Sequence, residues 1–360
     1  MTSDRVARVV EQLEARELDA LLVTGPANLR WLTGFTGSNG SAVVGRGGLL
    51  RFLTDFRYLT QSATEVDERF EREISRDLLD LAVQRLPEGT LGFDDAQMSV
   101  REHAKLEGLL GGRDSLVSLE PAGGLIEDLR LFKDAGELDK LRAAARLADE
   151  ALTEVLEQGL VGRRERDVGL DLELAIRRRG AEAVSFPPIV ASAERGALPH
   201  ADPTDAEIPA GTLVTIDWGA QLDGYASDCT RTFATGELDP RDAELYDVVL
   251  RAQEAALEAI RPGVLGREAD AVAREIIDAA GHAEHFGHGL GHGVGMEVHE
   301  APRLSPQGGD VALRPGMVVT VEPGVYVPGA TGCRIEDLVA VTDSGHEVLS
   351  TLGKHLQIVR

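Results

Sequence analysis

Two aspartates on a predicted β-hairpin constrain this chain more than any other feature of its sequence. In the segment 213–233, a β-branched run at 214–216 leads to Asp217, and a Gln-Leu-Asp-Gly turn separates it from Asp228. A turn centred on 222–223 would place the two carboxylates directly opposite each other, and a turn centred on 223–224 would offset them by two residues. Both registers leave the carboxylates on one face. Ionised carboxylates in an apolar strand are costly unless a cation compensates them, so we expect a positive group there.

A second acidic pair follows with the same pattern. Residues 316–324 repeat the glycine, threonine, acid and glycine of residues 211–219, with Glu322 in the place of Asp217. Glu336 follows Glu322 across a turn at 328–330, which again predicts two acids on one face. A polar hairpin face in water is the alternative for one such pair, but the recurrence favours a site. The helical segments 150–163 and 254–267 also match, so we predict two related halves that each contribute two acids.

Five of the nine histidines lie between residues 282 and 299, in a glycine-rich segment. So many glycines disfavour a helix, and we predict loop or strand here. A histidine cluster in a chain with four converging acids indicates a metal site. One imidazole with four carboxylates is an oxygen-rich ligand set, which favours manganese or cobalt over a cysteine-type zinc site. Two divalent cations about 3.5 Å apart acidify a shared water and polarise a carbonyl, which is the chemistry of hydrolysis.

The composition excludes several classes of partner. A formal net charge of -24 argues against a nucleic acid or an anionic membrane as partner. Two cysteines cannot build a disulfide framework, and no apolar stretch has the length of a membrane span or the form of a signal peptide. We therefore expect a cytoplasmic protein. At 360 residues and 43% hydrophobic content the chain can form two domains with real cores.

The order of predicted elements divides the chain into two domains. A helix at 5–16 and strands at 19–23, 41–44, 49–54 and 90–94 indicate an α/β domain over residues 1–124, with a glycine-punctuated loop at 28–40. The second domain, residues 125–360, begins with a long helix at 137–158. Trp31 has two interpretations, packing within its own domain or reaching the site of a partner subunit.

These motifs resemble those of a known family. The acidic hairpin, the His-Gly-Leu-Gly-His segment 288–292, Glu322-Pro-Gly and Arg334-Ile-Glu-Asp resemble the metal-site motifs of the aminopeptidase P and prolidase family of metallopeptidases. Residues 32–37 and 54–58 resemble the creatinase-type N-terminal domain of that family. The resemblance covers nearly the whole chain. It implies an α/β N-terminal domain followed by an α+β "pita-bread" catalytic domain with an internal pseudo-twofold duplication.

The resemblance also implies a role for each site residue. Five residues would hold two divalent cations, most simply Mn²⁺ with Co²⁺ and Zn²⁺ as alternatives: Asp217, Asp228, His292, Glu322 and Glu336. Asp228 and Glu336 would bridge the two cations. Four further roles are implied: Glu322 carries a proton to the leaving nitrogen, His299 steadies the tetrahedral intermediate, His200 lies near the scissile carbonyl, and His288 lines the pocket. Arg334 would hold the bridging carboxylates. The remaining histidines are assigned to surface or packing: His103, His282, His285, His346 and His355.

The implied activity is hydrolysis of the bond between an N-terminal residue and a following proline, by a hydroxide that bridges the two metals. The substrate is a peptide with proline at its second position, taken either as an Xaa-Pro dipeptide or as a longer peptide. A homodimer is the family expectation. The alternatives are a creatinase-like hydrolase, which would lack several ligands, and a binding protein that keeps the fold without catalysis.

Overall fold

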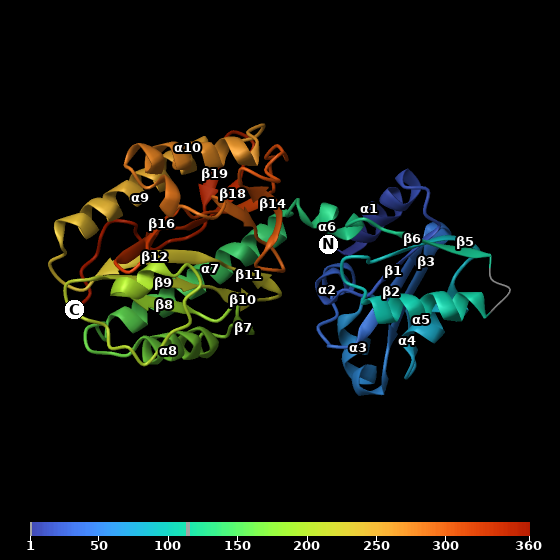
Figure 1. The fold of residues 1–360 in the computed structure, drawn as a ribbon. Helices are drawn as coiled ribbons and strands as arrows, with labels where there is room; N and C mark the ends of the chain where they lie inside the picture. The colour runs from blue at the N-terminus through green and yellow to red at the C-terminus, as the bar shows by residue number, and fades with distance from the viewer. Residues whose placement is uncertain (1, 113–115) are drawn as a thin grey trace. The chain divides into compact units, whose positions relative to one another are not determined.

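The computed structural model describes residues 2–112 and 116–360, which form two compact units (Figure 1). The division falls after Arg130, at the end of helix α6 (Leu125–Arg130), whereas the sequence prediction ended the first domain at Gly124. Each unit contains its own sheets, helices and buried apolar core. None of the helices in the described ranges combines the length and apolar character that crossing a bilayer requires.

The first unit is built on a six-stranded sheet with the order β4-β3-β2-β1-β5-β6. Strand β1 is antiparallel to β2 and parallel to β5, so the sheet is mixed. Its strands are β1 (Ala20–Val23), β2 (Gly40–Gly45), β3 (Leu49–Thr54), β4 (Glu71–Ile74), β5 (Gly89–Phe93) and β6 (Val117–Pro121). Its other helices are α1 (Thr2–Ala15), α2 (Pro26–Thr33), α3 (Leu59–Glu65), α4 (Leu78–Arg85) and α5 (Val100–Gly111). The predicted α/β character and the predicted strands are present.

Helix α2 corrects one sequence prediction, because it occupies much of the stretch that was predicted to be a loop. Pro26 stands in its first turn, where the missing N–H costs nothing, and Gly34 ends it with a φ of 84° that suits glycine. Trp31 on this helix is 1% exposed, with the Arg5 guanidinium 4.9 Å from its ring. Packing within its own unit is therefore the interpretation of Trp31 that the structure supports.

The second unit contains two helix pairs and several small sheets. Its helices are α7 (Ala135–Leu156), α8 (Glu165–Arg178), α9 (Pro240–Ala259) and α10 (Gly266–Ala279). The first half contains β7 (Ala183–Val184), β8 (Ile189–Ser192), β9 (Leu213–Trp218), β10 (Ala220–Leu222), β11 (Tyr225–Ala226) and β12 (Cys229–Ala234). The second half contains β13 (Gly291–Gly293), β14 (Glu300–Leu304), β15 (Val318–Val321), β16 (Gly324–Val327), β17 (Thr331–Arg334), β18 (Asp337–Val341) and β19 (His346–Val348).

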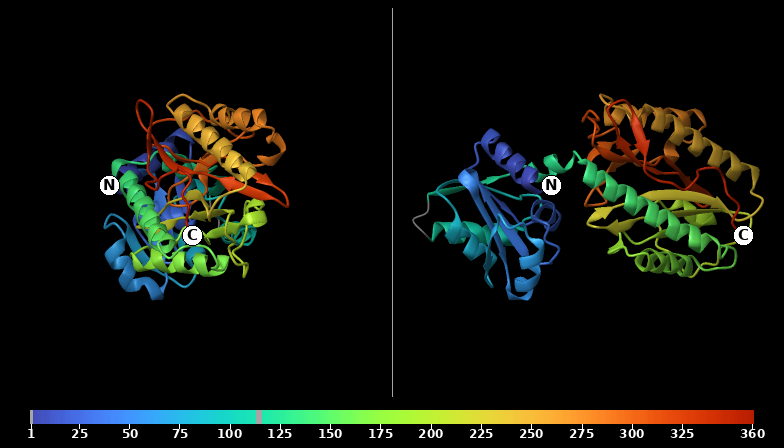
Figure 2. Two further views of the ribbon diagram at one scale, coloured as in Figure 1. Left: turned by 90° about the vertical axis from the view of Figure 1, so that its left-hand side faces the viewer. Right: turned by 180° about the vertical axis from the view of Figure 1, so that it is seen from behind.

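The internal repeat predicted from the sequence is visible in this unit. Each half has a helix pair joined at a glycine with positive φ, Gly159 at 75° and Gly263 at 89°. Each half then supplies antiparallel strands, β8-β9-β12 in one and β13-β15-β18 in the other. Figures 1 and 2 show these strands between α8 on one side and α9 with α10 on the other, with the long helix α7 running alongside them. The central strands of both halves thus meet inside the unit.

Candidate metal centre

The first acidic hairpin has the offset register of the two that the sequence allowed. Strands β9 and β12 pair Asp217 with Thr230 and Trp218 with Cys229. The turn is centred on Asp223 and Gly224, whose φ angles are 48° and 81°, as the common two-residue hairpin turn requires. Asp228 therefore lies two residues from the position opposite Asp217, which is on the same face of the hairpin.

The two acids of the second pair lie directly opposite each other across their hairpin. Strands β15 and β18 pair Val321 with Asp337, and β16 and β17 pair Gly324 with Arg334. Both ladders have the same register, so Glu322, which lies between β15 and β16, is opposite Glu336. A hydrogen bond of 3.0 Å from the backbone N–H of Glu336 to the carbonyl of Thr230 joins the two halves at this point.

All five predicted ligands lie together. Carboxylate oxygens of Asp217, Asp228 and Glu336 are within 4.8 Å of one another. His292 Nε2 is 3.6 Å from Asp228 Oδ2 and 3.3 Å from Glu322 Oε1, which connects the remaining two residues to the three acids. Three of the five come from the second half of the repeat and two from the first, so the cluster exists only because the halves face each other.

The charge of this cluster is poorly compensated by the protein itself. Asp217 accepts one hydrogen bond from Arg334 Nη2 at 2.7 Å, and its other carboxylate oxygen is buried without a partner. Glu336 accepts one from the Thr230 hydroxyl at 2.6 Å. Burial and then neighbouring carboxylates raise the pKa of both Asp228 and Glu336 well above the ordinary values. Buried acids with so few donors fit a pair of divalent cations.

Glu322 and His292 each shift the pKa of the other. Burial raises the pKa of Glu322, but the hydrogen bond and charge of His292 outweigh it and bring the pKa to about 2. Burial likewise lowers the pKa of His292, and Glu322 more than restores it. The His292 ring is fixed by a contact of 3.0 Å between Nδ1 and the Gly293 carbonyl, which directs Nε2 towards the acids.

Arg334 is buried behind the acids, and its guanidinium donates hydrogen bonds to four groups, one of which is the Pro199 carbonyl at 3.2 Å. Besides Asp217, it donates from Nε to the Thr230 hydroxyl at 3.0 Å and from Nη1 to the Tyr326 hydroxyl at 2.7 Å. The sequence pattern did not single out Thr230 or Tyr326. The period-two alternation from Glu322 along β16 puts Tyr326 on the same face, and that was the available signal. Its hydroxyl also lies 2.9 Å from His288 Nε2, so Tyr326 connects Arg334 to the histidine segment.

The three other predicted histidines lie around the acids. Burial lowers the pKa of His288, which is half-buried beside Tyr326. The His299 ring is 4.3 Å from that of His292, and burial followed by the His292 charge lowers the pKa of His299. His200 is exposed, yet its charge acts on the pKa of both His288 and His299, so it belongs to the same region.

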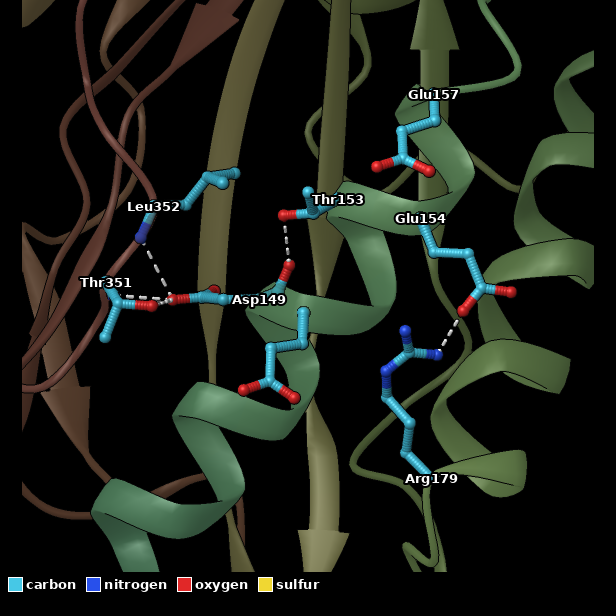
Figure 3. A pocket seen from close by; sticks show the side chains of 8 residues that line it. Asp149, Thr153, Glu154, Glu157, Arg179, Thr351 and Leu352 are labelled. Carbon is cyan, nitrogen blue, oxygen red and sulfur yellow. Dashed lines mark hydrogen bonds and ion pairs between the residues drawn. The ribbon is translucent and has the colours of Figure 1, made fainter.

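A surface cavity of about 570 Å³ lies elsewhere on the second unit and contains none of these residues (Figure 3). Its wall includes Asp149, whose carboxylate accepts hydrogen bonds from Thr351 and Leu352, and an ion pair between Glu154 and Arg179. Two of its acids, Asp149 and Glu154, are therefore engaged in structural contacts.

Comparisons with known proteins agree with this geometry. The family model described as metallopeptidase family M24 matches residues 139–343, and the one described as creatinase/prolidase N-terminal domain matches residues 5–132. A Xaa-Pro dipeptidase of Pyrococcus furiosus is 33% identical over 363 residues, which cover 98% of this chain and 99% of that protein. A relative from Bacillus subtilis described as an uncharacterized peptidase is 40% identical, covering 95% of this chain and 96% of its own length.

Solved structures match over almost the full chain. The structure of a Xaa-Pro dipeptidase from Bacillus anthracis superposes with a TM-score of 0.93 at 36% identity, covering 99% of this chain and all of that one. An X-Pro aminopeptidase from Thermotoga maritima gives a TM-score of 0.89 at 33% identity, with 99% and 100% covered. These matches confirm the predicted fold class, an α/β creatinase-type domain followed by a pita-bread catalytic domain.

The family match also bears on the metal centre. It implies a dinuclear metal site, for which the buried cluster of Asp217, Asp228 and Glu336 is the candidate. The chain is an enzyme of the metallopeptidase family M24, with a creatinase/prolidase N-terminal domain before its catalytic domain.

Proposed function

We propose that this enzyme hydrolyses the peptide bond between an N-terminal residue and a following proline. The observation that carries the proposal is the convergence of four carboxylates and one imidazole, in a chain whose full-length relatives include Xaa-Pro dipeptidases. That bond is a tertiary amide, so its nitrogen has no hydrogen and must gain a proton to leave. The site therefore needs a proton carrier as well as a means of activating water.

We propose that the five clustered residues would hold two divalent cations. When bound, the cations polarise the scissile carbonyl and acidify the attacking water. Four carboxylates and one imidazole suit manganese, with cobalt and zinc as alternatives. Cys229 lies close by and donates to the Glu336 carbonyl at 3.3 Å, but burial raises the pKa of its thiol well above the ordinary value, so it remains a thiol and does not join the ligands.

The other residues then have distinct tasks. We propose that Glu322 takes the proton from water and passes it to the proline nitrogen, with Oε1 oriented by the Thr320 hydroxyl at 3.0 Å. His299 and His200 would donate hydrogen bonds to the oxygen that becomes negative at the tetrahedral stage. His288, fixed by Tyr326, would form a wall of the substrate pocket, and Arg334 would hold Asp217 in place.

The relatives include both an Xaa-Pro dipeptidase and an X-Pro aminopeptidase, and an assay of substrate length distinguishes these two activities. We would assay Xaa-Pro dipeptides against Xaa-Pro-Xaa peptides, each with Mn²⁺, Co²⁺ and Zn²⁺. Cleavage only of dipeptides identifies a dipeptidase, and cleavage of the longer peptides identifies an aminopeptidase. Cleavage of neither class, or full activity in Asp217→Ala, would contradict the proposal. A protein that bound peptide without turnover after metal was added would instead be a binding module.

We also propose a homodimer that works in the cytoplasm. Both cysteines are buried free thiols, which suits a reducing compartment. Light scattering during gel filtration would measure the mass, and a monomer at micromolar concentration would contradict the proposed assembly.

A further inference from the structure

Two histidines outside the metal centre face each other at chelating distance. His282 Nδ1 lies 3.2 Å from His285 Nδ1, and both residues are half-buried. The ring centroids are 5.4 Å apart and the planes are inclined by 50°. We propose that His282 and His285 form a separate binding site for a transition-metal ion of the zinc or nickel class, held through the two Nδ1 atoms.

The local backbone preorganises this pair. Helix α10 ends at Ala279, and Gly281 turns the chain with a φ of 84°. His282 then donates its backbone N–H to the Ile277 carbonyl at 3.1 Å, and His285 donates its own to the His282 carbonyl at 2.9 Å. The second bond closes a 3₁₀ turn, in which side chains three residues apart lie over each other. Both imidazoles are therefore positioned before any ion arrives.

The distance between the nitrogens suits a shared ion. A zinc ion about 2.1 Å from each nitrogen would subtend an angle of roughly 100° between them, close to tetrahedral. Among the described residues, no third histidine, cysteine or acid offers a ligand atom within 4.8 Å of both nitrogens. Water would complete the shell, so we expect an open site of moderate affinity.

The surroundings favour a shared cation over the direct Nδ1–Nδ1 hydrogen bond that the distance of 3.2 Å also allows. The pair follows the C-terminal end of α10, where the helix dipole places partial negative charge. Glu244 on α9 acts electrostatically on His282, and Glu284 lies between the two histidines in the chain. Burial, followed by the charge of His285, lowers the pKa of His282, which leaves its ring neutral and able to bind metal at neutral pH.

The two sites should select different metals. The acidic centre offers mainly carboxylate oxygens, which suit manganese, whereas the histidine pair offers only imidazole nitrogens, which suit zinc, nickel or copper. We therefore expect the pair to stay empty in Mn²⁺ and to fill when zinc is supplied. The proposal does not depend on the substrate of the enzyme.

The test is a zinc count on the full chain. We would dialyse wild-type protein, His282→Ala, His285→Ala and the double variant against buffered zinc, and measure bound zinc by atomic emission. We expect each single variant to bind one zinc per chain less than wild type, and the double variant to lose no more, since either change removes the chelate. His103→Ala, a histidine of the first unit, serves as the matched control and should bind as wild type does.

Two further measurements make the result decisive. Circular dichroism melts in Mn²⁺ check that the variants fold, and their peptidase activity in Mn²⁺ should equal that of wild type. Equal zinc content in wild type and both single variants would overturn the proposal.

Discussion

Glu336 and Asp337 are neighbours in the chain, both almost fully buried, yet their environments are opposite. Burial and then the carboxylates of Glu322 and Asp217 raise the pKa of Glu336 well above the ordinary value. Burial also raises the pKa of Asp337, but Arg231 and Lys354 outweigh it and hold the pKa below the ordinary value. Successive strand residues point to opposite faces, so one face of this segment is short of positive charge and the other is supplied with it. Charge partners, not burial, separate the pKa of the proposed metal ligand from that of the structural acid.

The well-paired face also supports the poorly paired one. Arg231 donates to Asp337 Oδ1 at 2.8 Å and, from the same guanidinium, to the backbone carbonyl of Glu336. Lys354 Nζ and Gln253 Nε2 satisfy the other Asp337 oxygen at 2.8 Å and 2.9 Å. The segment that carries Lys354 is attached in turn to helix α7 through Asp149, which accepts from Thr351 and Leu352 (Figure 3). A structural ion cluster thus holds the backbone of a proposed metal ligand.

The largest expected effect is on the poorly paired face. Asp228→Asn removes a proposed ligand without changing the shape of the side chain. Loss of a residue that only supports a metal ligand costs about 10- to 100-fold in affinity or activity. We therefore expect loss of a ligand itself to lower kcat/KM in Mn²⁺ by more than about 100-fold. When a chelator has removed the metal, the variant should have a higher unfolding free energy in urea than wild type, because one of several carboxylates that repel each other is gone.

Asp139→Asn, at an exposed carboxylate, is the matched control and should change neither quantity. If metal-free Asp228→Asn unfolded at lower urea concentration than metal-free wild type, repulsion among the carboxylates would be contradicted.

The well-paired face should respond in the opposite way. Asp337→Asn leaves the buried Arg231 without its carboxylate, and breaking a buried pair on one side costs about 3–5 kcal/mol. We expect that loss of unfolding free energy in urea both with and without metal. Glu347→Gln, which breaks a partly exposed pair with Arg142, should cost less than about 1 kcal/mol. Equal losses in the two variants would remove the distinction between the faces.

Metal removal tests the comparison without mutation. A ligand that binds only the folded state stabilises it by about 2.7 kcal/mol when its free concentration is 100 times Kd. Chelation should therefore lower the unfolding free energy of wild type by roughly this amount. Chelation should lower the unfolding free energy of Asp228→Asn far less, and it should lower that of Asp337→Asn by as much as that of wild type. Thermal and urea melts with and without a chelator measure the three differences.

The sequence predicted the acids of this site because their geometry is local. Strand alternation and hairpin turns fix which of two nearby carboxylates share a face, so Asp217 with Asp228 and Glu322 with Glu336 followed from spacing alone. The register itself stayed open until the positive φ angles of Asp223 and Gly224 were known. The roles of the surrounding residues came from family resemblance and remain predictions.

The partners of these acids do not follow from local spacing, because they are distant in the chain. Thr230 meets Glu336 across 106 residues, and Arg231 meets Asp337 across the same separation. No local pattern marks either pair, since a threonine and an arginine on a strand are ordinary residues. Helix α2 was missed for another reason: its flanking glycines resembled a loop, and Pro26 was not interpreted as a helix start.

The smallest expected effect separates the hydroxyl of Thr230 from its shape. Thr230 is fully buried, donates to Glu336 and accepts from Arg334, so Thr230→Val keeps the volume and removes both hydrogen bonds. We expect Mn²⁺ affinity to fall by about 10-fold, the lower end of the range for such supporting groups. Calorimetric titration of Mn²⁺ measures this, with Thr153→Val on helix α7 as the control that should bind as wild type does. Because Thr230 joins the proposed ligand to the arginine, unchanged affinity in Thr230→Val would mean that the acids hold their geometry through the backbone alone.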